Sequence, residues 1–300
     1  MHEWYEGHNV QHRDHSAFIV FNQEVLLFYN AKNGTLKIGK SGMDYITFGK
    51  GNEHLIVIPG LGDGIKTVKG TAAVFAMMYK CFAKDYKVYV FSRKNSLEAG
   101  CSTRDMAADQ KTAMSILGIS QADFIGVSQG GMISQYVAID YPELVKKLVL
   151  AVTLSKQNET VQKVIGSWIK MAESKNYKSL FIDTTEKLYT EKRLKKLRPL
   201  YPLLSKIGKP KDYNRFIIQA NACIKHNAYS ELDKIKSPAL VIGVDNDKVV
   251  GVNTSEEIAG KIKNSKLILY EDYEHGVYEE AKTFNSRILD FLAEQDFQLI

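Results

Sequence analysis

The stretch that most constrains the fold of this chain is residues 122–131, which read ADFIGVSQGG. An apolar run, Phe124–Val127, leads directly into a Gly-x-Ser-x-Gly pentapeptide centred on Ser128, and a helical pattern then stops at Tyr141–Pro142. A strand, a very tight turn and a helix in this order hold the apical serine in a strained conformation that exposes its hydroxyl. The motif predicts a nucleophilic serine; the alternative is an ordinary glycine-rich turn between a strand and a helix.

Short apolar runs alternate with helical patterns on both sides of this stretch. Strands are expected at Leu55–Ile58, Lys87–Phe91, Phe124–Val127, Leu148–Thr153, Ala239–Val244 and Lys266–Tyr270, after a hairpin of Thr35–Gly39 and Asp44–Phe48 joined by Ser41–Gly42. Helices are expected at Thr67–Lys84, Ser102–Leu117, Thr254–Lys263 and Val277–Leu292, with Ser102 and Asp105 as a capping box. This alternation predicts an α/β fold with a mostly parallel central sheet and helices on both faces.

Residues 156–235 interrupt the alternation, and three helices are expected there, at Val161–Ser174, Thr184–Leu197 and Asp212–His226. The segment carries 17 positive and 8 negative side chains, a balance of +9 against −3 for the remainder of the chain. A helical cap over the strand ends is the natural interpretation, because chemistry in open α/β sheets is located there. Its basic surplus favours an anionic substrate or an acidic surface; the alternative is a set of solvated helix faces.

The remaining organisation is an N-terminal extension, residues 1–32, and a core domain in two parts, residues 33–155 and 236–300. The extension is rich in histidine, and His8 and His12 have the spacing of a possible metal pair. Its apolar stretch Ala17–Tyr29 is too short and too polar to span a bilayer. We expect a peripheral segment outside the catalytic fold.

Composition excludes several classes of protein. The 300 residues are 45% hydrophobic and 25% charged, with a net charge of +6, which is typical of a globular protein and unlike a nucleic-acid binder. The three cysteines Cys81, Cys101 and Cys223 show no ligand spacing, which predicts free, buried thiols in a reducing, cytoplasmic compartment. We expect no metal, no redox cofactor and no stable membrane insertion; the oligomeric state is left open.

A serine nucleophile needs a base, and a histidine suits that task because its pKa lies near neutral pH. His275 follows the last expected strand and precedes the final helix, where a loop-borne base belongs; the alternative is an exposed turn histidine. The base needs a carboxylate partner. Asp245 and Asp247 both follow the strand Ala239–Val244, and Asp247 is favoured because it lies farther into the loop; either could instead be a turn or helix-capping aspartate.

The negative oxygen of a tetrahedral intermediate requires donors that are already in place. One expected donor is the backbone N–H of Gln129, directly after Ser128. The other is the N–H of Leu61, in the glycine-rich loop Pro59–Gly64. That loop could alternatively be only a tight turn in which Asp63 caps the next helix.

With Ser128, Asp247 and His275 in this chain order, the sequence resembles the α/β-hydrolase superfamily over about residues 33–293. GVSQGGM, LVIGVDNDKVVG and YEHGVYEE are similar to its nucleophile, acid and histidine regions. The resemblance implies a nucleophile elbow and a cap inserted after the sixth core strand, as in capped esterases, lactonases and C–C bond hydrolases. Pro59-Gly60 stands where many members have His-Gly, and the elbow serine argues against the dehalogenase and epoxide-hydrolase branches.

The leading functional hypothesis is a carboxylesterase-like serine hydrolase that needs no cofactor. The alternatives are an acyltransferase or C–C bond hydrolase with the same three residues, or a small-molecule receptor on the same fold. Trp168, Met171 and Phe216 are candidate walls of the substrate pocket; core packing is the alternative for each.

Overall fold

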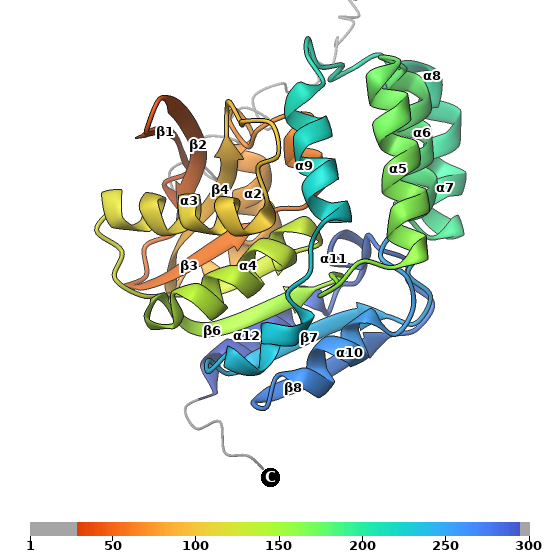
Figure 1. The fold of residues 1–300 in the computed structure, drawn as a ribbon. Coiled ribbons are helices and arrows are strands. Elements are labelled where there is room, and N and C mark those ends of the chain that lie inside the picture. The colour runs from red at the N-terminus through yellow and green to blue at the C-terminus, as the bar shows by residue number, and fades with distance from the viewer. Residues whose placement is uncertain (1–28, 295–300) are drawn as a thin grey trace, which may run out of the picture.

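The structure is a computed structural model that describes residues 29–294, and one eight-stranded sheet forms its centre (Figure 1). The strand order is β1-β2-β4-β3-β5-β6-β7-β8. Strand β2 runs antiparallel to both of its neighbours, and the other pairs are parallel. The strands are β1 Lys32–Ile38, β2 Ser41–Phe48, β3 Glu53–Ile58, β4 Tyr86–Lys94, β5 Ala122–Val127, β6 Val145–Ala151, β7 Ala239–Val244 and β8 Ser265–Tyr270. The predicted α/β fold is confirmed.

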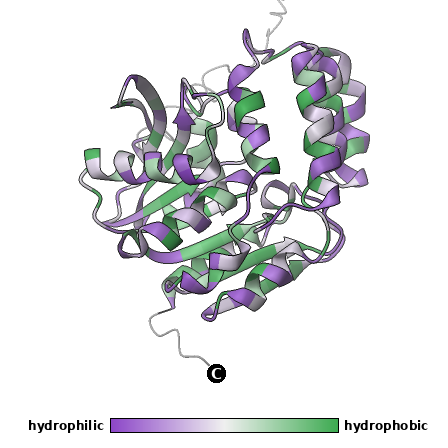
Figure 2. Cartoon of the chain, in the orientation of Figure 1, coloured by the Kyte–Doolittle hydropathy of each residue, from purple (hydrophilic) through white to green (hydrophobic). Residues whose placement is uncertain are grey.

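Helices cover both faces of the sheet. One face packs against α3 (Thr103–Ile116), α4 (Gln129–Asp140) and α10 (Thr254–Lys261), and the other against α2 (Ala72–Met78), α11 (Val277–Glu280) and α12 (Phe284–Ala293). Successive side chains of a strand point to opposite faces. In β3, Leu55 and Val57 therefore join one core, whereas Ile56 and Ile58 join the other. Figure 2 shows that the central strands of the sheet, which are covered by helices on both faces, are mostly hydrophobic.

The segment between β6 and β7 forms the cap. Its helices are α5 Glu159–Glu173, α6 Tyr177–Leu188, α7 Glu191–Leu197, α8 Tyr201–Leu204 and α9 Asn214–Ile224. Helices α5, α6 and α9 share a third apolar core that contains Trp168 and Phe216 and also contacts Leu61, Met132 and Val249 from the core domain. Because these three residues follow the carboxyl ends of strands, the cap lies over that edge of the sheet (Figure 1).

Three expected helices differ from the observed ones. The helix predicted at Thr67–Lys84 is only α2 with a short 3-10 turn, because Gly70 has φ +84° and Val68 N donates to Ser92 Oγ. The predicted helix Thr184–Leu197 is interrupted where Tyr189 becomes extended. The final helix is split because Ala281 leaves the helical conformation with ψ 114°. In contrast, the capping box of Ser102 and Asp105 is present as predicted.

The remaining expectations concern the cysteines, the N-terminal extension and membrane-spanning helices. All three cysteines are free, but the expected burial is wrong for Cys81, which is exposed, and for Cys101, which is half-buried. The expected extension lies almost wholly outside the described residues, as do His8 and His12. Within residues 29–294, no helix is both long and apolar enough to cross a bilayer.

His226 follows α9 and is packed into the core domain, beneath the cap rather than within it. Its Nε2 donates to Gln135 Oε1 at 3.3 Å, and the Thr103 hydroxyl donates to Nδ1 at 2.9 Å. Gln135 Oε1 can only accept, so in the neutral ring Nε2 carries the proton and Nδ1 is the acceptor. Burial lowers the pKa of His226 to about 3.

Acid should therefore destabilise the fold through His226. Between the folded pKa of about 3 and the ordinary value of 6.5, only the unfolded chain takes up the proton, so stability falls as the pH drops below 6.5. About 2 kcal/mol of unfolding free energy should be lost between pH 8 and pH 5 from this residue. Urea unfolding of the native protein and of His226→Gln at several pH values checks this. Equal pH dependence in the two proteins would contradict it.

Candidate active site

Ser128 occupies a sharp turn between β5 and α4, with φ 54° and ψ −118°, outside the usual range of a serine. Its backbone is fixed on both sides. Its N–H donates to Ala151 O at 2.8 Å, and its carbonyl accepts from Thr153 Oγ1 at 2.8 Å. A Cβ on Gly130 would lie 1.9 Å from Ile58 O, so glycine is required where the helix passes the neighbouring strand.

His275 and Asp247 form a buried pair. The ring Nδ1 donates to both carboxylate oxygens of Asp247, at 2.8 and 3.0 Å, and the side chains are 4% and 3% exposed. Asp247 Oδ1 also accepts from the N–H groups of Val249 and Val250 at 2.8 and 2.9 Å. Asp245, the other candidate, is exposed to solvent. This arrangement places the ring proton on Nδ1 and leaves Nε2 as the basic nitrogen.

Ser128 and His275 line the same pocket. Within the described residues, neither Ser128 Oγ nor His275 Nε2 makes a hydrogen bond, so no direct bond joins the two side chains. A nucleophile and its base are often loosely aligned in an empty site and draw together when substrate binds. The structure thus brings Ser128, His275 and Asp247 to one edge of the sheet.

The two expected oxyanion donors flank the serine. Leu61 is the first residue of a 3-10 turn, Leu61–Gly64, and Gln129 is the first residue of α4. The first N–H groups of a helix have no acceptor within it, so both can face a ligand. A Cβ on Gly60 would lie 3.3 Å from Ser128 Cβ, which shows how closely this loop approaches the elbow.

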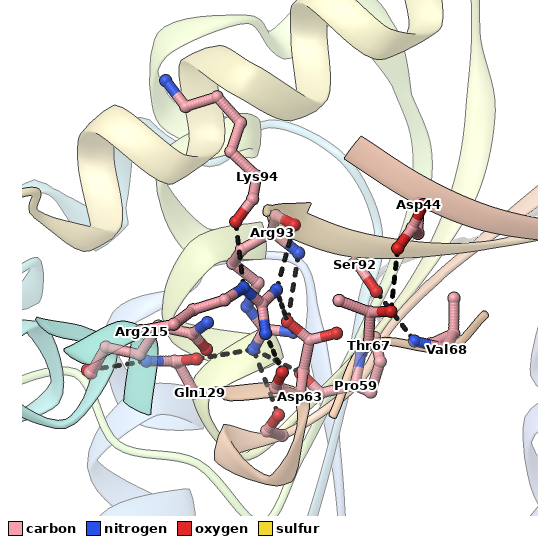
Figure 3. Close-up of polar contacts among 12 residues, drawn as sticks. Asp44, Pro59, Asp63, Thr67, Val68, Ser92, Arg93, Lys94, Gln129 and Arg215 are labelled. Carbon is pink, nitrogen blue, oxygen red and sulfur yellow. Dashed lines mark hydrogen bonds and ion pairs between the residues drawn. The ribbon is translucent and has the colours of Figure 1, made fainter. Parts of the chain in front are cut away.

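A buried arginine connects the loop Pro59–Gly64 with the start of α4, a contact that no local sequence pattern predicts. Arg93 stands at the end of β4 and is fully buried (Figure 3). Its Nη2 donates to Pro59 O at 2.5 Å, Gly60 O at 3.3 Å and Gln129 Oε1 at 2.7 Å. Burial lowers the pKa of Arg93 to about 10, so it is still charged at neutral pH. Arg93 therefore holds the loop Pro59–Gly64 in place relative to the turn at Ser128.

Asp63 balances this charge together with a second arginine, from the cap. Asp63 Oδ2 accepts from Arg93 N at 3.1 Å and from Arg215 Nη2 at 2.5 Å (Figure 3). Arg215, in α9, also donates to Asp63 O, Arg93 O and Lys94 O. The alternative that Asp63 only caps a helix is wrong, since it lies between two guanidinium groups.

The sequence gives little indication that Asp63, Arg93 and Arg215 form a cluster. Arg93 follows the apolar strand run and was visible as a charge at a strand's carboxyl end. Arg215 could not be told apart from the other 16 cations of the cap.

The pocket has a volume of about 440 Å³ and lies between the core domain and the cap. Trp168 and Phe216 line it, as expected, but Met171 does not, because it packs against the apolar core of the cap. Its other walls are mostly aliphatic and aromatic; the charged lining residues are Asp63, Lys66 and Glu279.

The cap is attached next to the histidine. Gly276 N donates to Leu188 O at 2.6 Å, and Tyr189 Oη donates to Glu279 at 2.8 Å. Thr190 donates to Glu280 through both its N–H, at 3.0 Å, and its hydroxyl, at 2.8 Å. The break between α6 and α7 thus serves to hold the cap against the segment that carries His275.

A family model described as the alpha/beta hydrolase fold matches residues 53–282. The chain belongs to this family, and the expected resemblance is confirmed.

Its relatives are distant and are named for different substrates. The chain is 24% identical to "Putative carbamate hydrolase RutD" of Stutzerimonas stutzeri, over 80% of this chain and 92% of the relative. It is 26% identical to 2-hydroxy-6-oxononadienedioate/2-hydroxy-6-oxononatrienedioate hydrolase of Burkholderia vietnamiensis, over 83% of this chain and 90% of the relative. Among solved structures, the enol-lactonase of Burkholderia xenovorans has a TM-score of 0.74 at 19% identity, covering 87% of this chain and 100% of that chain. These relatives support a hydrolase, while the solved structure supports the fold.

Proposed function

We propose that this protein is a serine hydrolase that cleaves an ester, or a related carbonyl compound, through an acyl-serine intermediate. The observation that carries the proposal is that Ser128 and the paired His275 line one pocket, with the histidine held by Asp247. A strained serine, a base with a free Nε2 and a buried carboxylate partner are the parts that acyl transfer needs.

In the proposed reaction, Ser128 Oγ attacks the ester carbonyl carbon and its proton moves to His275 Nε2. The N–H groups of Leu61 and Gln129 hold the oxygen that becomes negative. Collapse of the tetrahedral intermediate breaks the bond to the alcohol, which leaves with the proton from His275. A water molecule, deprotonated by His275, then attacks the acyl-serine; collapse of the second intermediate releases the acid and returns the proton to Ser128. Asp247 stabilises the imidazolium in both steps.

The pocket favours a neutral substrate with an apolar acyl group. Its walls include Val161, Ile165 and Phe181. Burial of an apolar acyl chain against them removes apolar surface from water, which is favourable. A dicarboxylate such as an oxononadienedioate would need cations in the pocket, but among the described residues the one cationic lining residue is Lys66, which is exposed. We therefore favour an ester over this C–C bond substrate. The free cysteines support a cytoplasmic location.

A substrate panel tests the proposal. Nitrophenyl esters of increasing acyl length, a nitrophenyl carbamate, a thioester and a vinylogous diketone are offered to the native protein. Medium-chain esters should give the highest kcat/KM, and a fluorophosphonate should label Ser128. A preference for the diketone or the carbamate would reassign the substrate. Tight ligand binding without turnover or labelling would instead indicate a receptor.

A further inference from the structure

One edge of the cap exposes an apolar ridge. Leu200, Leu203 and Ile207 follow each other over α8 and its flanking turns, and they are 48%, 61% and 59% exposed. Large aliphatic side chains exposed together mark a contact surface more often than isolated ones do.

Lysines flank this ridge in the sequence. Residues 195–211 contain no aspartate or glutamate. The five lysines of the segment are exposed: Lys195, Lys196, Lys206, Lys209 and Lys211. Lys195 interacts electrostatically with Glu191, whereas within residues 29–294 the other four have no carboxylate partner. Arg198 differs from them because it is paired with Glu186 and Glu191. We call the ridge and the five lysines the basic-apolar face.

The basic-apolar face is joined to the wall of the pocket. Tyr177 and Phe181 of α6 line the pocket. Tyr177 Oη donates to Ile207 O at 3.0 Å, and the Phe181 ring packs edge-on against Tyr201, with centroids 5.9 Å apart. The same short segment therefore presents the ridge on its outer side and supports the substrate site on its inner side.

We propose that the basic-apolar face docks on an anionic lipid bilayer, without insertion of a spanning segment, and that the ester substrate comes from that membrane. The second clause rests on the proposed function. Lysines near an anionic membrane surface are attracted to it, and exposed aliphatic side chains enter the boundary between headgroups and acyl chains.

The face suits a bilayer better than other partners. A nucleic acid would satisfy the lysines but leave Leu203 and Ile207 exposed to water. A second copy of the chain in the same orientation would bring five lysines against five lysines, which is unfavourable. A membrane that combines negative headgroups with an apolar interior matches both parts of the face.

Vesicle sedimentation with the full-length Ser128→Ala protein tests docking without hydrolysis. Vesicles of phosphatidylcholine alone are compared with mixtures of phosphatidylcholine and phosphatidylglycerol. We expect partition to the anionic vesicles that weakens in high salt. Added to that background, Lys206→Glu with Lys209→Glu should lower the partition coefficient by about tenfold or more. Leu203→Ser with Ile207→Ser should also lower it several-fold.

Matched controls lie on α3, on the opposite side of the molecule from α7 and α8 (Figure 1). Lys111→Glu and Ile116→Ser change an exposed lysine and an exposed isoleucine there and should leave partition unchanged. When the same surface substitutions are made in the protein that keeps Ser128, every variant should hydrolyse a soluble ester at the native rate. This comparison separates docking from activity. Partition that is absent, or equally reduced by the α3 variants, would overturn the proposal. So would a DNA duplex that binds in a manner dependent on the lysines but not on Leu203 and Ile207.

Discussion

Replacing Ser128 with alanine should lower kcat for the best ester of the panel by about 10⁴-fold or more, with the fold intact. The hydroxyl oxygen forms the bond to the acyl group in the proposed reaction, and no neighbouring side chain can replace it. The thiol of Cys223 lines the same pocket, but burial raises its pKa to about 12, so it stays protonated and unreactive. The remaining rate would come from the oxyanion donors and from binding.

Steady-state kinetics of Ser128→Ala, His275→Gln and the double variant give the sharpest form of this experiment. Residues that act as one unit lose activity non-additively, so the double variant should be little worse than Ser128→Ala alone. KM should change little, since neither substitution removes the apolar walls. Activity of Ser128→Ala within tenfold of the native protein would remove the basis of the proposed mechanism.

The largest loss of stability is expected from Asp63→Asn. This isosteric change removes the carboxylate between Arg93 and Arg215 and leaves two guanidinium groups facing each other, one of them fully buried. Breaking a buried ion pair by removing one partner costs about 3–5 kcal/mol, because the remaining charge is uncompensated. Urea unfolding with activity measurements on the same samples would record the loss.

Arg215→Met and Arg93→Met are the matched comparisons, because each leaves one arginine balanced against Asp63. Both should therefore destabilise less than Asp63→Asn. Arg93→Met should also lower kcat more than it changes KM, since Pro59 O, Gly60 O and Gln129 Oε1 lose their shared donor. If Asp63→Asn proved the mildest of the three, charge balance would not be what holds this cluster together.

The sequence was sufficient for the parts of the fold that depend on local patterns. Apolar runs of strand length gave the sheet, and the elbow motif located the tight turn at Ser128. The pairing of His275 with Asp247 followed from the rule that parallel strands present their loops at one edge of the sheet. Such patterns are readable because each is specified within a few neighbouring residues.

The sequence was insufficient where long-range contacts override local preference. The break at Tyr189 forms because Thr190 bonds to Glu280, which lies 90 residues away. Met171 and Trp168 lie on one helix, but only Trp168 lines the pocket, and that choice depends on how α5 packs. Arg93 and Arg215 are 122 residues apart in the sequence, so no local pattern predicts that they share the carboxylate of Asp63.

The contact of Arg215 with Asp63 bears on how this protein could be engineered or could diversify. Cap segments are attractive units for recombination, since they enter and leave the core at two nearby points. Here, however, a foreign cap without an arginine at position 215 would leave Asp63 of the core domain without one of its two cationic partners. Successful chimaeras should therefore carry position 215 with the cap, or replace Asp63 and Arg93 together with a neutral pair.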